Sequence, residues 1–214
     1  GTTDMSVYYD GILRHTAVIP YAGVNITTDI RKGLGVLNAQ AEQMKVQFGS
    51  ALAEMANNNA YITIPGLRGM QPKEVSIKNL SNIIQARMQE ILEYVVYHLK
   101  QVNLDKQLYG GIILTGGGAQ MQHLIQLTEF VTGLGARIGY PNEHLAGGHA
   151  EALMNPMYST CIGLILRGYH DFENNRLRFI GENGNTLTEN GDLFISIPEN
   201  ESVKSEEPAP EQDD

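Results

Sequence analysis

One stretch decides the fold class: Gly111-Ile112-Ile113-Leu114-Thr115-Gly116-Gly117-Gly118. Its apolar run predicts a strand covered on both faces, as in the sheets of α/β proteins. A helical pattern follows, so the stretch predicts a strand, a glycine loop and a helix. Glycine lets a ligand approach the backbone closely, and the N–H groups and dipole of a helix N-terminus favour an anion. A tight turn without any ligand is an equally good interpretation of three glycines.

On both sides of this stretch, segments with a strand pattern alternate with segments with a helix pattern. Asp10-Gly11 supplies a type I′ turn signal between two strand-like segments, which predicts a hairpin. Apolar residues at helical spacing from Leu80 to Leu99 predict one long amphipathic helix whose stripe faces the core. The predicted strands are residues 5–9, 12–19, 61–64, 75–77, 111–115 and 136–140, with a further hairpin of 179–180 and 193–195. The predicted helices begin at Asn25 or Thr27, after Asn38, near Leu80, after Gly118 and at Asn155-Pro156, and the last of them ends at Gly168.

Length and composition limit the classes of protein to consider. The chain has 214 residues, of which 42% are apolar, so it can bury a core. It contains no apolar run long enough for a transmembrane helix and no signal-peptide pattern at its start, and its one cysteine excludes a disulfide framework. These features fit a cytoplasmic protein. Because Lys and Arg form no cluster, we expect no nucleic-acid partner.

The net charge of −9 is concentrated at the end of the chain. Residues 199–214 hold seven acids and one lysine, a balance of −6, which leaves −3 for the other 198 residues. This segment has almost no large apolar side chains, so it is expected to be a disordered acidic linker. Residues 169–198, where the signals are weak, are expected to form a weakly structured extension.

Two further features have ligand-binding interpretations. Gly1-Thr2-Thr3-Asp4 combines hydroxyls and consecutive amides that suit phosphates, and its Asp suits a hydrated divalent cation. Glu42 and Lys45 lie three residues apart and so share one face of a helix. They form either a solvated ion pair worth roughly a few tenths of a kcal/mol or a contact for a ribose. Taken alone, neither feature is specific.

Together these features occur in the same order as in the actin-like ATPases. Within that superfamily, the sequence resembles most the FtsA family of bacterial cell-division proteins, over roughly residues 1–168. The resemblance is carried by the stretches Gly1-Thr2-Thr3-Asp4, Arg14-His15-Thr16-Ala17-Val18-Ile19-Pro20, Ala41-Glu42-Gln43-Met44-Lys45, Ile84-Gln85-Ala86-Arg87, Ile113-Leu114-Thr115-Gly116-Gly117-Gly118-Ala119-Gln120, Arg137-Ile138-Gly139-Tyr140-Pro141 and Pro156-Met157-Tyr158-Ser159-Thr160.

The resemblance implies an α/β fold, the second half of an actin-like (ribonuclease H-like) ATPase with a mixed sheet and flanking helices. Residues 1–37 and 104–168 would form the larger subdomain, and residues 38–103 a smaller α/β subdomain inserted in it. The first half of such a fold, with its own phosphate loop, is not in this chain. We therefore expect the intact protein to bind ATP with at most weak ATPase activity. This chain alone is expected to bind ATP poorly or not at all, and to be inactive.

The resemblance also assigns roles to individual residues, with ATP and Mg²⁺ as the implied ligands. The residues that would contact the nucleotide are Gly1, Thr2 and Thr3 at the phosphates, Gly116, Gly117 and Gly118 at the α-phosphate and sugar, and Glu42 and Lys45 at the ribose and adenine. Lys45 also fits on physical grounds, as a flexible cation near an anionic ligand. No catalytic residue and no metal ligand of the protein is assigned.

The implied partners follow from the family as well. Its smaller subdomain receives the C-terminal peptide of the tubulin-like division protein FtsZ, so Arg87 on the long helix would contact a peptide carboxylate, with Lys78 as the second cation. Without the family, a local pair with Glu90 or Glu93 is the better interpretation of Arg87. The resemblance further implies self-association into filaments, other divisome proteins as partners, and attachment to the inner membrane through an anchor that is not in this chain. The implied location is the cytoplasmic face of the membrane at the division site.

Other functions stay open at this point. A rod-shape filament protein of the MreB type, or a pilus-assembly relative, shares both glycine loops, and a small-molecule kinase belongs to the same superfamily. His144 and His149, with acids nearby, invite a metal site, but their spacing matches no known ligand signature. Cys161 is expected to be buried on a helix, which argues against a nucleophile.

Overall fold

The computed structural model describes residues 1–57, 59–65, 71–105, 107–142 and 153–174, together with three short strands at 179–180, 186–187 and 193–194. The chain divides into two compact units, Gly1–Ile162 and Gly163–Asp214. No helix in the described part of the chain is long and apolar enough to cross a membrane.

The first unit begins with the predicted hairpin. Strands β1 (Thr3–Tyr9) and β2 (Ile12–Ile19) pair in antiparallel fashion, and a register shift follows Val7. At the turn, Asp10 has a φ of 53° and Gly11 a φ of 70°. Both central residues of a type I′ turn need positive φ, so the turn prediction is confirmed.

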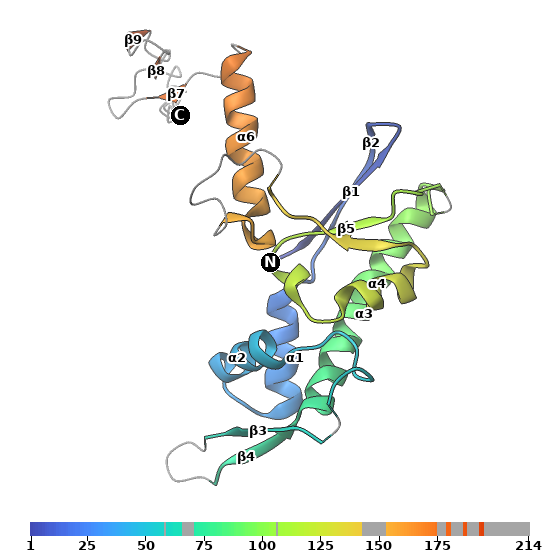
Figure 1. The fold of residues 1–214 in the computed structure, drawn as a ribbon, viewed down its shortest axis with the longest axis vertical. Coiled ribbons are helices and arrows are strands. Elements are labelled where there is room, and N and C mark those ends of the chain that lie inside the picture. The colour runs from blue at the N-terminus through green and yellow to red at the C-terminus, as the bar shows by residue number, and fades with distance from the viewer. Residues whose placement is uncertain are drawn as a thin grey trace, which may run out of the picture. The chain divides into compact units, whose positions relative to one another are not determined.

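Three helices supply most of the core. They are α1 (Gly23–Leu34), α2 (Asn38–Phe48) and α3 (Ile77–Gln101), and Figure 1 shows α1 and α2 beside each other with α3 running along α1. The short strands β3 (Tyr61–Ile64) and β4 (Lys73–Ser76) pair in antiparallel fashion just before α3. The stripe on α3 is buried as predicted, and its core residues are Leu80, Ile84, Met88, Ile91, Leu92 and Leu99.

The start of α1 differs from the prediction of a cap at Asn25 or Thr27. The helix begins at Gly23, and Asn25 occupies its first turn, where its side-chain oxygen accepts a hydrogen bond of 2.9 Å from the backbone N–H of Ala22. Asn25 therefore satisfies one free N–H of the helix end from inside the helix. At its other end, Gly35 caps α1 with a φ of 61°.

Residues 111–138 form a further part of the first unit, called here the glycine-loop layer. Strand β5 (Ile112–Leu114) pairs in parallel with β6 (Ala136–Ile138), and α4 (Leu124–Thr132) lies in the connection between them. The expectation that this strand is covered on both faces is wrong, because Ile113 is 54% exposed. Among the described residues β5 pairs only with β6, so the expected mixed sheet is divided into separate two-stranded sheets.

The helix after Asn155 crosses into the second unit. A short 3₁₀ turn, η2 (Pro156–Tyr158), leads into α6 (Ser159–Glu173), and Asn155 caps the turn by accepting a 3.0 Å hydrogen bond from Met157 N–H. The helix continues past the predicted end at Gly168. Arg167 and Asp171, one turn apart, form an ion pair of 2.7 Å across that glycine, which offsets part of its cost in a helix.

The strand pairing in the second unit differs from the prediction. Strands β7 (Phe179–Ile180) and β9 (Leu193–Phe194) were expected to pair with each other. Instead, β8 (Thr186–Leu187) lies between them and pairs with both in antiparallel fashion. The sequence around β8 carries no alternating apolar pattern, which is why this strand was not predicted.

Candidate functional site

The glycine loop leaves β5 and stays open to solvent. Gly116 has a φ of 85°, which a residue with a side chain rarely adopts, and its N–H donates a 3.0 Å hydrogen bond to Pro156 O. Thr115 donates a hydrogen bond of 3.0 Å to Gly139 O. Gly117 and Gly118 are exposed, and a Cβ built on either would meet no atom within 4 Å. The loop is therefore held firmly at its base and free above its second and third glycines.

The helix that follows the loop differs from the prediction. The glycines open a 3₁₀ helix of four residues, η1 (Gly117–Gln120), and α4 begins only at Leu124. Its N-cap residue is His123, in the left-handed region with a φ of 59°. The dipole of an α-helix is thus not aimed at the glycines, and an anion there would rely on the N–H groups of the loop itself.

The Gly-Thr-Thr segment begins β1. Gly1 and Thr2 are exposed, and the Thr2 hydroxyl donates a 3.2 Å hydrogen bond to Asp4 Oδ2. The Thr3 hydroxyl donates a 2.7 Å hydrogen bond to Tyr21 O, so it ties β1 to the entry of α1. Of the two hydroxyls, only that of Thr2 lies at the surface where it could meet a phosphate.

Glu42 and Lys45 join α2 to the first turn of α1. The Lys45 ammonium donates to Glu42 Oε2 at 2.8 Å, to Thr27 Oγ1 at 2.9 Å and to Gly23 O at 3.1 Å, which uses its three donors. The side chain of Lys45 is 12% exposed, whereas that of Glu42 is 49% exposed. The pair is therefore more than a solvated ion pair, since it bridges two helices.

The carboxylate of Glu42 is held in its charged form. It accepts a very short hydrogen bond from the Thr27 hydroxyl besides the one from Lys45. Burial raises the pKa of Glu42, but the hydrogen bonds from Lys45 and Thr27 and the charge of Lys45 outweigh burial, so its pKa lies below the usual value. A half-exposed carboxylate whose pKa lies below the usual value suits the hydroxyls of a ribose as an acceptor.

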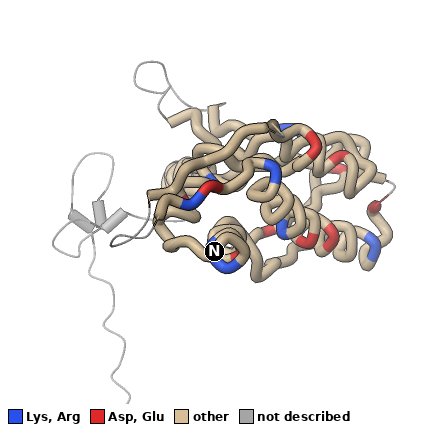
Figure 2. Tube along the Cα trace, turned by 90° about the horizontal axis from the view of Figure 1, so that it is seen from below, with Lys and Arg blue, Asp and Glu red and all other residues tan. Residues whose placement is uncertain are grey.

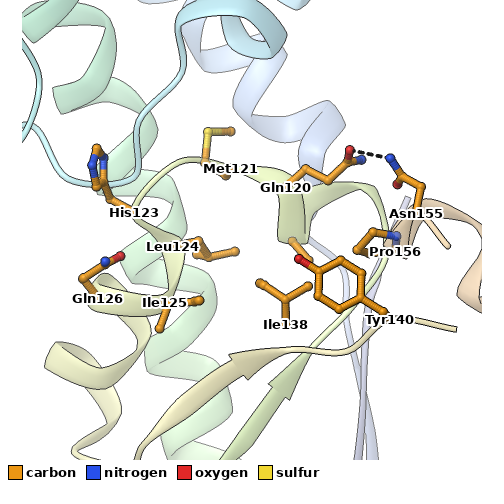
Figure 3. A pocket seen from close by; sticks show the side chains of 11 residues that line it. Gln120, Met121, His123, Leu124, Ile125, Gln126, Ile138, Tyr140, Asn155 and Pro156 are labelled. Atoms are coloured by element: carbon orange, nitrogen blue, oxygen red, sulfur yellow. Dashed lines mark hydrogen bonds between the residues drawn. The ribbon is translucent and has the colours of Figure 1, made fainter. Parts of the chain in front are cut away.

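A pocket of about 550 Å³ lies next to the glycine loop (Figure 3). Its walls come from η1, α4, the end of β6 and the residues beyond it, and its polar side chains are Gln120, His123, Gln126, Tyr140 and Asn155. Asn155 donates a hydrogen bond of 2.9 Å to Gln120 Oε1, which closes one side of the pocket. None of the described residues that line it is Asp, Glu, Lys or Arg, so a neutral, flat group such as a nucleobase suits it better than a phosphate. Sequence reasoning missed these residues, although Gln120, Tyr140 and Asn155 each lie within or beside a stretch that carries the family resemblance.

Arg87 is already engaged within the first unit. Its Nε donates to Asp29 Oδ2 at 2.6 Å, its Nη1 donates to Glu90, and its guanidinium lies 5.2 Å from the ring centroid of Tyr21. The hydrogen bond to Asp29 raises the pKa of Arg87 against the opposite effect of burial. The local pair with Glu90 is confirmed, whereas Glu93 accepts from Gln89 instead. The pair with Asp29, which links α3 to α1, was not predicted.

Lys78 is exposed on the first turn of α3. It precedes Arg87 by nine residues, about 14 Å along the axis and on nearly the opposite face of the helix. The structure therefore does not bring these two cations together. Basic and acidic positions are interspersed over the first unit (Figure 2).

The structure tests the prediction for Cys161 but not the one for His144 and His149. Cys161 is exposed on α6, so the prediction that it is buried is wrong. His144 and His149 lie outside the described residues. Within the described part of the chain, no group of three or more His, Cys, Asp and Glu side chains could hold a metal ion.

The fold defines the class of protein. The chain is similar in structure to two solved actin-like proteins. The first is MreB5 of Spiroplasma citri bound to AMPPNP, with a TM-score of 0.64 and 20% identity, covering 82% of this chain and 52% of that chain. The second is the ethanolamine utilization protein EutJ of Carboxydothermus hydrogenoformans, with a TM-score of 0.52 and 15% identity, covering 78% of this chain and 45% of that chain. The expected actin-like α/β fold is therefore confirmed.

The sequence then gives the family. The family described as "Cell division protein FtsA" matches residues 1–163. The chain is 38% identical to FtsA of Neisseria meningitidis over 77% of this chain, and 33% identical to FtsA of Pseudomonas aeruginosa over 78%. The chain belongs to the FtsA family, in agreement with the resemblance. It spans 40% of the length of each of these two relatives.

Proposed function

We propose that the protein is an ATP-binding, actin-like cell-division protein that polymerises and links the FtsZ ring to the membrane. Membership of the FtsA family supports the cell-division role. The single observation that supports nucleotide binding is the loop of Gly116, Gly117 and Gly118, where a Cβ added at any of the three would meet no atom within 4 Å. The family match also favours this function over a rod-shape filament, a pilus-assembly protein or a small-molecule kinase.

In the proposed site, ATP lies against the glycine loop. Gly117 and Gly118 would contact the α-phosphate and sugar, and Gly1, Thr2 and Thr3 would face the phosphates. Mg²⁺ would accompany the nucleotide, and Asp4 is the carboxylate beside this loop suited to hold a hydrated ion. A related protein, MreB5 of Spiroplasma citri, has been solved with AMPPNP, a nucleotide of this class.

Glu42 and Lys45 have unequal parts in this proposal. Because Lys45 donates to three internal acceptors, a direct bond to ATP would need one of them to be given up. Glu42 has the exposed carboxylate and would accept from the ribose hydroxyls. Lys45 would then orient Glu42 and keep it charged.

The proposed partners are the C-terminal peptide of FtsZ, further copies of the protein, other divisome proteins, and the inner membrane. The location is then the cytoplasmic face of the membrane at the division site. Arg87 would meet a carboxylate of the FtsZ peptide. Its guanidinium has five N–H donors, so it can keep Asp29 and Glu90 and still offer a donor to a peptide. Lys78 would need a separate part of the peptide.

Calorimetry with MgATP on the full-length protein tests nucleotide binding. We expect Gly117→Val to abolish binding, because its side chain would occupy the path of the sugar and phosphate. The fold should be unaffected, since a Cβ at Gly117 meets no atom. Gly110→Val is the matched control, because Gly110 is equally open and is outside the loop. Unchanged binding by Gly117→Val would contradict the proposed site.

A further inference from the structure

Strand β2 and helix α3 bring two histidines together in the first unit. The ring centroids of His15 and His98 lie 5.5 Å apart, with the ring planes tilted by 36°. His15 Nε2 and His98 Nδ1 are both shielded from solvent, and neither has a hydrogen-bond partner. Buried polar atoms are nearly always hydrogen-bonded, so each such exception needs an explanation. Two of them on neighbouring rings point to one shared ligand.

Both rings are held in place by their surroundings. The ring of Tyr97 meets that of His98 edge to face, with centroids 5.5 Å apart and an angle of 73°. Tyr97 is 56% exposed, and its oxygen accepts a 2.7 Å hydrogen bond from Gln101. His15 lies opposite the buried Val7 in the hairpin. The two histidines are thus positioned before any ligand arrives, which lowers the cost of binding one.

The separation of the rings fits a shared metal ion. Zinc binds imidazole nitrogen at about 2.0–2.1 Å and prefers tetrahedral angles. Since the nitrogen lies about 1 Å from the ring centroid, two rings on one tetrahedral ion would have centroids roughly 5 Å apart. The observed 5.5 Å is close to this value.

The donor atoms determine the class of ion. Imidazole nitrogen suits zinc, copper and nickel, whereas Mg²⁺ and Ca²⁺ prefer oxygen ligands. No third His, Cys, Asp or Glu completes a cluster in the described part of the chain, so water would fill the remaining positions. Both histidines are half-buried, so the rings reach the surface although the two nitrogens are themselves shielded.

We propose that His15 and His98 bind one divalent transition-metal ion of the zinc class. The ion would fasten the β1–β2 hairpin to α3 and satisfy both buried nitrogens. A ligand that binds the folded state raises the melting temperature. The site is separate from the glycine loop and does not depend on nucleotide binding.

Thermal unfolding of the chelator-treated chain, with and without excess ZnCl₂, tests the site. We expect Zn²⁺ to raise the Tm by several degrees, and MgCl₂ to leave it unchanged. His15→Gln and His98→Gln should each lose most of the rise, and the control His170→Gln should keep it. His170 lies on α6 in the second unit and contacts Asn174.

The proposal is overturned if Zn²⁺ fails to raise the Tm, if MgCl₂ raises it equally, or if His98→Gln keeps the full rise, which would place zinc elsewhere. NMR of the unmodified chain gives a second measurement that needs no variant to fold. Zn²⁺ should shift the ring resonances of His15 and His98 together. A shift of neither ring would equally overturn the site.

Discussion

Two layers of the first unit differ in how far their side chains are buried or paired within the chain. One is the helical layer of α1, α2 and α3, and the other is the glycine-loop layer of β5, η1, α4 and β6. In the helical layer the apolar stripe is buried, and Lys45 and Arg87 have partners on neighbouring helices. In the glycine-loop layer Ile113 is 54% exposed, Phe130 is 80% exposed, and Gly117 faces open space. The first layer is completed by its own residues, whereas the second offers surfaces that a ligand or partner would cover. Core packing should therefore contribute more to stability in the helical layer than in the glycine-loop layer.

The largest expected effect contrasts two isoleucines. Ile84 is fully buried on α3, so Ile84→Ala should lower the free energy of unfolding by about 2–5 kcal/mol. Ile113→Ala, at a half-exposed site on β5, should change it by about 0.5 kcal/mol or less. Urea unfolding followed by circular dichroism measures both. Equal losses would mean that the glycine-loop layer is as tightly packed as the helical one.

The sequence predicts the helical layer well because its signals are local. The stripe from Leu80 to Leu99, the turn at Asp10-Gly11 and the glycine after α1 are each set by residues within a few positions. The coverage of β5 could not be predicted, because an apolar run does not tell which elements will pack on it. The same limit applies to Cys161, whose exposure depends on tertiary contacts.

The candidate site was predicted only through its motifs. The glycine loop and the Glu42–Lys45 pair stand out in the sequence, but their partners do not. Thr27 and Gly23 contact Lys45 from 18 and 22 residues away, and Asp29 contacts Arg87 from 58 residues away. No periodicity connects residues over such distances, so only the fold shows that Lys45 and Arg87 have structural roles besides the binding roles proposed for them.

Two glycines of the loop layer give the next contrast. Gly111 has a φ of 70°, and a Cβ there would lie 2.2 Å from Gly135 O, so Gly111→Ala should force β5 and β6 apart. We expect a loss of about 1–3 kcal/mol from this strain. Gly117→Ala should be close to neutral, because its Cβ meets no atom. Thermal unfolding of the two variants tests the contrast, and a clear loss of Tm in Gly117→Ala would contradict the open loop.

The peptide contact proposed for Arg87, beside its internal ion pairs, predicts a smaller effect that can be separated into two parts. Arg87→Glu should weaken binding of a labelled FtsZ tail peptide by more than the ~0.2–1 kcal/mol of an exposed ion pair, because repulsion replaces attraction. Asp29→Asn keeps the cation and weakens its internal partner, so peptide affinity should hold or rise. Fluorescence anisotropy measures both affinities.

The comparison of these two variants distinguishes contact from positioning. If both variants weaken peptide binding to the same extent, Arg87 acts by holding α1 against α3, and the proposed contact is wrong. If neither changes the affinity, the peptide binds elsewhere. Glu93→Gln serves as the control, because Glu93 is exposed on α3 and is not among the acids that pair with Arg87.

The smallest expected effect is a pH dependence at the bridge between α1 and α2. The folded-state pKa of Glu42 lies below its ordinary value of 4.5, so the folded state holds its proton less tightly than the unfolded state. The stabilisation is therefore complete above the ordinary pKa and is lost as the pH falls through the lower, folded-state pKa. Glu42→Gln should lower the Tm modestly near neutral pH, and its difference from the unmodified chain should shrink in acid below pH 4.5. Thr27→Val removes one hydrogen bond to the same carboxylate and should show part of this dependence. A difference between Glu42→Gln and the unmodified chain that stays constant with pH would show that the carboxylate gains nothing from Lys45 and Thr27 in the folded state.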